Sequence, residues 1–173
     1  MTRKARAVKK QRAELQECSA LDGLMIPALL DSLGTIFDTM VGEKIYPGAP
    51  VLKQGNAALG EVTGLIGMRS DSVSGSIALT FNLPTMRVIS LNLMGHELTS
   101  IGKDAADLTG ELINMLAGGA KRVLSEQGHE FDMQTPQMLL GEGHEIVHHR
   151  AGNTVLLPVW IGAGEFYIEL NFV

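Results

Sequence analysis

An internal repeat constrains the fold of this chain more than any other feature of its sequence. Residues 31–42 and 107–118 align at a constant distance of 76 positions and read DSLGTIFDTMVG and DLTGELINMLAG. The aspartate, the internal glycine and the final glycine coincide, and similar apolar residues fill several positions between them. Both segments have the three- and four-residue apolar spacing of an amphipathic helix. We therefore infer that the chain contains a duplicated unit.

Each repeated helix precedes a proline-containing segment and a predicted antiparallel hairpin. We expect Pro27 in the first turn of its helix, Asp104 as the cap of the long helix, and Gly128 just beyond its end. One such unit cannot cover its own sheet, so two units sharing one sheet are expected. The predicted fold is α+β, a pseudo-twofold duplication of helix plus β-hairpin units with long helices packed on a mostly antiparallel sheet. In chain order we predict helix 27–41, strands 59–69 and 74–82, helices 84–94 and 104–127, and strands 135–141, 145–149, 154–161 and 165–173.

The charge of the chain is unevenly distributed. The net charge is −5, yet residues 1–12 carry six basic side chains and no acidic one, and the other 161 residues carry 8 basic and 19 acidic side chains. We expect residues 1–22 to form a flexible basic arm. Residues 23–173 are expected to form a single domain with repeats over 24–95 and 104–173. The acidic body argues against a broad nucleic-acid footprint on the domain.

Several other classes of protein are excluded by composition. No apolar run reaches the roughly 18 residues that a membrane span needs. The basic start lacks the apolar stretch of a secretion signal. The single cysteine, Cys18, excludes an intramolecular disulfide and a cysteine-based zinc site. We therefore expect a cytoplasmic protein.

Polar and small side chains are aligned along one side of the second repeated helix. At about 100° per residue, five of them fall within about 40° of one line. A solvated polar face is the simplest explanation, but it does not account for two consecutive glycines inside a helix, each costing about 1 kcal/mol relative to alanine. A missing side chain lets another surface approach closely, so we predict a ridge that docks a partner. Its members are Asp107, Glu111, Asn114, Gly118 and Lys121.

The segment DLTGELINMLAGGAKRVLSEQG, which contains this ridge, resembles the CheC/CheX/FliY family of bacterial chemotaxis phosphatases. The family motif is an acidic or hydroxyl residue, then Glu-x-x-Asn, then small residues, then a proline some twenty positions on. The resemblance covers about residues 24–173. With a single intact motif, the chain is more similar to CheX than to CheC, which generally carries two. The matching residues are Asp107, Glu111, Asn114, Gly118 and Pro136.

The resemblance implies that the chain dephosphorylates the aspartyl-phosphate of a CheY-like receiver domain. Asn114 would position the attacking water, and Glu111 would pair with the active-site lysine of the receiver. Asp107, Gly118 and Lys121 would bind that partner. The family also implies a homodimer and no cofactor of the chain's own, because the expected Mg²⁺ belongs to the receiver.

The first repeat departs from the motif. Thr35 and Asp38 stand where the second repeat has Glu111 and Asn114, 76 positions later. A carboxylate cannot donate a hydrogen bond as an amide does, and a threonine cannot form the ion pair. We therefore expect that face to be inactive.

Two alternatives remain at this stage. One is a non-catalytic module of the same fold that docks a receiver or a flagellar switch protein. The other is a zinc peptidase, because His144-Glu145-Ile146-Val147-His148 matches the zincin pattern HExxH. That pattern works on a helix, where the two histidines converge on one ion. Here the segment is predicted to be a strand, in which positions four apart are about 13 Å apart.

Overall fold

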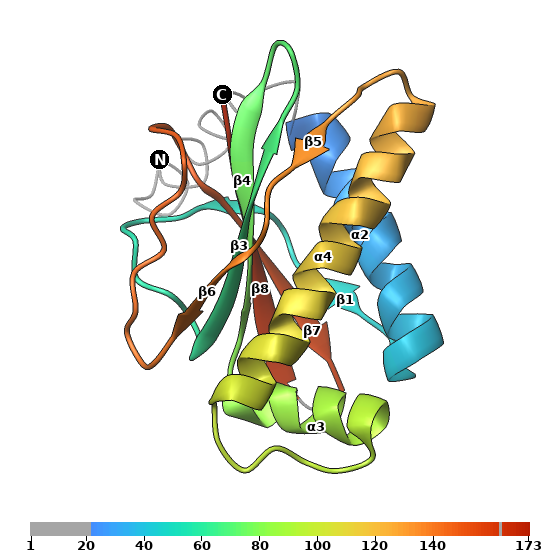
Figure 1. Cartoon of the computed structure of the whole chain (residues 1–173), viewed down its shortest axis with the longest axis vertical. Helices are drawn as coiled ribbons and strands as arrows, with labels where there is room; N and C mark the ends of the chain where they lie inside the picture. The colour runs from blue at the N-terminus through green and yellow to red at the C-terminus, as the bar shows by residue number, and fades with distance from the viewer. Residues whose placement is uncertain (1–21, 163) are drawn as a thin grey trace, which may run out of the picture.

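The structure, a computed structural model, describes residues 22–162 and 164–173. The predicted basic arm lies outside these residues except for Asp22. The described chain forms a sheet of eight strands, with two long elements of helix on one face and a shorter helix across one end (Figure 1). In chain order the elements are α2 (Asp22–Ile36), the π-helical turn η1 (Phe37–Val41), β1 (Tyr46–Pro47), β2 (Val51–Leu52), β3 (Val62–Arg69), β4 (Ser74–Phe81), α3 (Leu83–Met94), α4 (Lys103–Glu126), β5 (Asp132–Met133), β6 (Gln137–Leu140), β7 (Val155–Ile161) and β8 (Gly164–Phe172).

The strand order confirms the expected pseudo-twofold architecture. The order is β1-β7-β8-β4-β3-β5, with β2 also beside β7 and β6 also beside β3. Every pairing is antiparallel, and β4 and β8 form the central pair, with Gly75 opposite Phe172 and Thr80 opposite Tyr167. If β1, β2, β3 and β4 are exchanged for β5, β6, β7 and β8, respectively, the same order results, read from the opposite edge of the sheet. The two halves of the sheet are therefore topologically equivalent.

The structure pairs the residues of the two repeated helices, α2 and α4, differently from the sequence alignment. At a distance of 76 positions, the buried Ala28 would correspond to the exposed Asp104. Over α2 the burial patterns agree at 84 positions instead, and Pro27 and Leu30 then correspond to Glu111 and Asn114. The alignment failed because any two amphipathic helices share apolar spacing, whereas packing against the sheet fixes the register. The buried residues that coincide are Met25, Ala28, Leu29, Ser32, Leu33 and Ile36 with Thr109, Leu112, Ile113, Leu116, Ala117 and Ala120.

Close contacts on two sides hold α4 in place. Against α2, the Ser32 hydroxyl donates to the Leu116 carbonyl at 3.1 Å. A Cβ added at Gly119 would lie 2.0 Å from Ser32 Oγ, so this glycine lets the two helices approach. Against the sheet, a Cβ added at Gly64 of β3 would lie 2.9 Å from the Ile113 side chain. These contacts bury two sides of α4 and leave its remaining side exposed.

Three predictions about element boundaries were wrong. Pro27 lies inside α2 rather than in a first turn, since the helix already includes Asp22. The cap of α4 is Gly102, which provides no side-chain hydrogen bond, instead of Asp104. The predicted strand at 145–149 contains only an isolated bridge between Ala57 and Glu145. By contrast, the α4 end at Glu126 and the positive φ of 87° at Gly128 confirm the predicted end.

The segment Asp22–Val41 is long and apolar enough to cross a membrane, by length and composition alone. In this fold it is a core helix, because one side of it is buried against α4 and the sheet. Leu29 and Phe37 are at most 1% exposed, whereas Asp31 and Asp38 lie on the exposed side. This division is typical of a helix that packs on the core of a domain.

Candidate functional site

Glu111 and Asn114 lie next to each other on the exposed side of α4, as the sequence predicted. They are three residues apart in a continuous helix, so their Cβ atoms are about 5–6 Å apart. Both side chains are exposed. Within residues 22–162 and 164–173, no group forms a hydrogen bond or an ion pair with either side chain. A carboxylate and a carboxamide are thus available together to an incoming molecule.

These two residues line a groove of about 620 Å³ together with Asp107. The opposite wall comes from the segment at the edge of the sheet, where Pro136 and Met138 face α4. Met138 pairs with Gly64 in the β3–β6 ladder, and its Sδ would lie 3.6 Å from a Cβ added at Gly110. The motif proline therefore lies across the groove from Glu111 and Asn114.

Met94 and Met138 also line this groove and were not predicted as site residues. Met94 is the last residue of α3, the helix that precedes α4 in the chain. It is 42% exposed although it is apolar. Neither methionine belongs to a motif, and only the chain fold brings them beside α4, so no sequence pattern could have identified them.

Asp107 forms an ion pair within its own helix. Its Oδ2 accepts a hydrogen bond from Lys103 Nζ at 2.5 Å, and the two side chains are 63% and 85% exposed. The hydrogen bond and charge of Asp107 raise the pKa of Lys103 above its ordinary value, and Asp104 adds to this effect. Exposed i,i+4 pairs are weak. Asp107 can therefore exchange Lys103 for a basic group of a partner.

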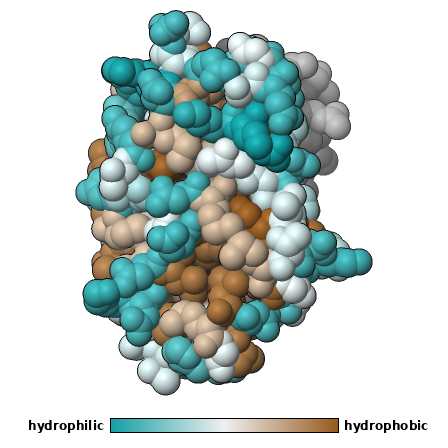
Figure 2. Space-filling view, turned by 45° about the vertical axis from the view of Figure 1, so that its right-hand side comes forward, coloured by the Kyte–Doolittle hydropathy of each residue, from teal (hydrophilic) through white to brown (hydrophobic). Residues whose placement is uncertain are grey.

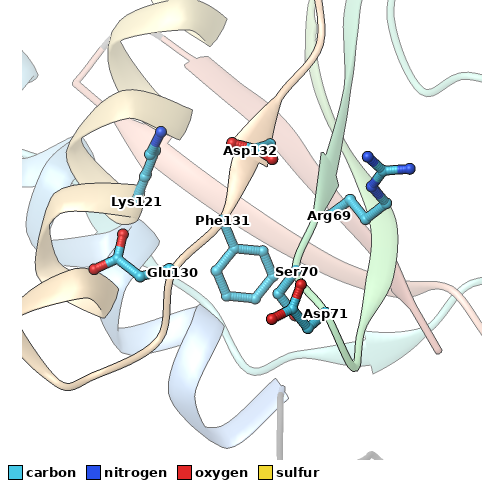
Figure 3. A pocket seen from close by; sticks show the side chains of 7 residues that line it. All are labelled: Arg69, Ser70, Asp71, Lys121, Glu130, Phe131 and Asp132. Atoms are coloured by element: carbon cyan, nitrogen blue, oxygen red, sulfur yellow. The ribbon is translucent and has the colours of Figure 1, made fainter.

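The two other predicted ridge residues differ in their surroundings. A Cβ added at Gly118 would meet no atom within 4 Å, so the helix surface there is open. Lys121 lines a different cavity, of about 430 Å³. Figure 3 shows this cavity, with Lys121 extending from α4 beside Glu130 and with Arg69 on the far side of Phe131. Seven residues separate Lys121 from Asn114, which corresponds to about 10 Å along the helix axis.

The HExxH segment does not form a zinc site. Residues 141–153 form no helix and cross the second face of the sheet, which is the face opposite α2 and α4. His144 Nε2 lies 2.7 Å from Thr63 Oγ1, and His148 hydrogen bonds to different residues. No group of three or more His, Cys, Asp or Glu side chains suited to a metal ion occurs in the described part of the chain. The zinc peptidase alternative is therefore wrong.

His148 instead belongs to a buried polar network on the second face of the sheet. Its Nδ1 lies 2.8 Å from Ser76 Oγ, and its Nε2 lies 3.1 Å from Glu169 Oε2. Glu169 Oε2 is a carboxylate oxygen and can only accept, so the His148 Nε2–H donates to it, and Ser76 Oγ also accepts the His149 amide. Lys53 Nζ bonds to Glu169 Oε1 at 2.6 Å.

This arrangement contains a serine, a histidine and a carboxylate, yet it is not a hydrolase site. Ser76 is fully buried, so no substrate reaches its hydroxyl. The side chains of Lys53, His148 and Glu169 are at most 6% exposed. Each charge in the network has an opposite charge or a hydrogen-bond partner, which is how buried polar groups are stabilised. The network anchors residues 141–153 to the sheet.

Comparison with known proteins identifies the family of this chain. A family model described as chemotaxis phosphatase CheX matches residues 62–159. A CheC-like superfamily protein from Shewanella sp. PV-4 is 40% identical with a TM-score of 0.80, and the match covers 87% of this chain and 97% of that one. The chemotaxis protein CheX from Vibrio vulnificus is 35% identical with a TM-score of 0.79, over 86% and 99% of the two chains.

A third solved structure includes a partner. It is a CheX–CheY–BeF₃–Mg²⁺ complex from Borrelia burgdorferi, 20% identical with a TM-score of 0.68, and the match covers 86% of this chain and 97% of that one. At this identity the likeness concerns the fold alone. No curated protein matches the chain. From the family match and the two closer structures, the chain belongs to the CheX family of chemotaxis phosphatases.

Proposed function

We propose that this protein hydrolyses the aspartyl-phosphate of a CheY-like receiver domain in the cytoplasm, with Asn114 and Glu111 as its catalytic residues. The observation that carries the proposal is their position. They are adjacent, exposed and without partners in the described chain, and they share one groove with the motif proline, Pro136. Side chains placed in this way can enter the active site of another protein.

The chemistry requires positioning more than a strong acid or base. A water oxygen attacks the phosphorus atom, and the bond between phosphorus and the aspartyl oxygen breaks. The receiver regains its carboxylate, inorganic phosphate leaves, and the proton of the water leaves with the phosphate. Because an acyl phosphate already has a good leaving group, the reaction is accelerated mainly by alignment and electrostatics.

Asn114 fits the task of aligning this water. Its carboxamide has an acceptor oxygen and two N–H donors, so it can fix both the position and the orientation of a water molecule. It is neutral, which avoids repulsion between a carboxylate and the phosphoryl oxygens. Leu30, the residue at the equivalent position of α2 by burial, has no polar group, so the first repeat lacks this function.

Glu111 fits the task of pairing with a lysine of the receiver. It is one helical turn from Asn114 and carries no ion pair within the described residues. Pairing its carboxylate with a receiver lysine would fix the receiver relative to Asn114. Asp107 would add a second acidic contact, Gly118 would allow close approach, and Lys121 would contact the partner at the periphery. The Mg²⁺ that neutralises phosphoryl charge belongs to the receiver.

The test is an assay of phosphate release from a CheY-like receiver that has been phosphorylated with acetyl phosphate. We expect the wild-type chain to accelerate release in the presence of Mg²⁺. We expect Asn114→Ala to lower kcat by at least about 100-fold, since loss of alignment alone has effects of this size. Asp38→Ala, which removes an exposed carboxylate from η1, is the matched control and should retain full activity.

Two results would contradict the proposal. Full activity of Asn114→Ala would remove the catalytic assignment. Binding of the receiver without any acceleration would show a docking module that is not an enzyme. Circular dichroism of each variant establishes that the fold is retained, so that lost activity can be assigned to the missing side chain.

A further inference from the structure

We propose that the exposed side chains of Leu91 and Met94 on α3 form the apolar part of the receiver-docking surface, next to Glu111 and Asn114. The inference rests on the proposed function, because it concerns the same partner. It adds α3 to a site that the motif places on α4 and at Pro136. It also predicts that binding and catalysis are carried by different residues.

The first observation is the exposure of these two side chains. Leu91 is 45% and Met94 is 42% exposed, and they lie three residues apart, so they share one side of α3. Met86 and Ile89, on the other side of the same helix, are fully buried. Figure 2 is turned so that the side of the molecule with α2 and α4 comes forward. Apolar surface is gathered in the lower half of this view. Clustered exposed apolar side chains in a soluble domain mark interaction sites.

The second observation is that Met94 lines the same groove as Glu111 and Asn114. A protein complex of ordinary size buries about 800 Å² on each partner, which corresponds to a disc about 16 Å in radius. A receiver whose phosphoryl group reaches Asn114 therefore has to cover the groove and its rim. Met94 lies inside that area. Leu91 lies about one helical turn before Met94, on the same side of α3.

The third observation is that α3 is held rigidly at both ends. Asn82 caps its start by accepting the Thr85 amide at 2.9 Å, and the Thr85 hydroxyl donates to the Glu165 carbonyl at 2.9 Å. Near its other end, Ser90 Oγ accepts the amide of the buried Leu98 at 3.0 Å. Because α3 is already ordered, its apolar side can be covered without a further loss of backbone entropy.

The surface chemistry agrees with a protein partner. The groove places carboxylates and an amide beside Met94, and Leu91 lies one turn away on α3. An interface commonly combines polar contacts with apolar anchors in this way. Methionine and leucine provide contact area, and methionine also adapts to surfaces of different shape. Glu111 and Asn114 would then contribute mainly to the chemical step, and Leu91 and Met94 mainly to affinity.

The test compares Leu91→Glu/Met94→Glu with Val147→Glu. Val147 is the matched control because it is 64% exposed and lies in residues 141–153, on the second face of the sheet. Phosphate release is measured as a function of the concentration of phosphorylated receiver. We expect the double variant to raise KM by about tenfold or more, with kcat within twofold of wild type, and Val147→Glu to change neither value.

Calorimetry with a receiver loaded with beryllofluoride and Mg²⁺ measures docking without turnover, and the double variant should weaken this binding by a similar factor. Unchanged KM and unchanged affinity in the double variant would overturn the inference and leave the proposed function intact. If the wild-type chain binds the receiver without hydrolysing it, the proposed function fails while the docking surface is still tested by affinity. A wild-type chain that does not bind the receiver contradicts both.

Discussion

Gly118 and Gly119 provide a sharp test, because substitution of these neighbours by alanine should have opposite effects on stability. Gly118→Ala places its Cβ in open space, with no atom within 4 Å. The only consequence for folding is a better helix former in the middle of α4, a gain of about 1 kcal/mol. For a domain of this size, 1 kcal/mol corresponds to an increase in Tm of about 2–4 °C.

Gly119→Ala meets the opposite situation. The added Cβ would lie 2.0 Å from Ser32 Oγ and 2.8 Å from Ser32 Cβ, so α2 and α4 must separate or Ser32 must give up its hydrogen bond to Leu116. Overpacking costs about 1–3 kcal/mol, and the lost hydrogen bond costs about 1 kcal/mol. After the gain in helix propensity of about 1 kcal/mol, the net loss is about 2 kcal/mol, or about 4–8 °C in Tm.

Differential scanning calorimetry of the two variants and the wild type measures this difference directly. Equal Tm values for the two variants, or a Gly118→Ala variant less stable than the wild type, would refute the packing argument for α4. Activity supplies a second measurement on the same proteins. If a partner approaches the open surface at residue 118, Gly118→Ala should raise KM several-fold although the protein is more stable.

Three further predictions follow from other parts of the structure. Glu169→Gln leaves the buried Lys53 ammonium without its counter-charge and should destabilise the fold by about 3 kcal/mol, measured by urea unfolding; a loss below 0.5 kcal/mol would contradict the buried network. Burial, aided by Glu165, raises the pKa of Tyr167 to about 12, so the native state keeps a proton that the unfolded state releases near pH 10. Stability should therefore fall as the pH rises from 10 to 12, and Tyr167→Phe should remove this part of the loss in a pH series of unfolding curves. Chelation of Mg²⁺ by EDTA should abolish phosphate release, added Mg²⁺ should restore it, and Zn²⁺ should not be required; dependence on Zn²⁺ would contradict the account of the histidine segment.

The repeat predicted the architecture because each unit exposes a sheet that only a second unit can cover. Its details were less accurate where tertiary contacts decide the outcome. The alignment at 76 positions compared helices by their apolar spacing, which many shifts satisfy. Burial instead places Pro27 and Leu30 opposite Glu111 and Asn114. The relation between the repeats is thus visible in the topology and hidden in the local sequence.

The candidate site was predictable to the extent that it lies on one helix. Glu111 and Asn114 share a side of α4 because of helical geometry, and the sequence contains that geometry. Met94 and Met138 come from other elements, and only the fold brings them to the groove. The two neighbouring glycines could not be distinguished from the sequence either. Gly118 faces open space, whereas Gly119 faces Ser32.

The histidine segment shows how a motif depends on its backbone. His144 and His148 have the spacing of a zinc site, but the pattern requires a helix, and residues 141–153 form none. A strand was predicted there instead and is also absent. The side chains of Ser76, Thr63 and Glu169 hold these histidines against the sheet, so contacts distant in sequence determine the path of the segment.

The central claim is that Asn114 aligns the water that attacks the receiver's phosphoryl group. The most direct measurement is the single-turnover rate constant for dephosphorylation of a phosphorylated CheY-like receiver, with the phosphatase in saturating excess. Saturation removes differences in affinity, so the rate constant reports the chemical step alone. The account predicts that Asn114→Ala falls to the intrinsic rate of the receiver while Asp38→Ala keeps the wild-type rate. A wild-type rate constant in Asn114→Ala would contradict it.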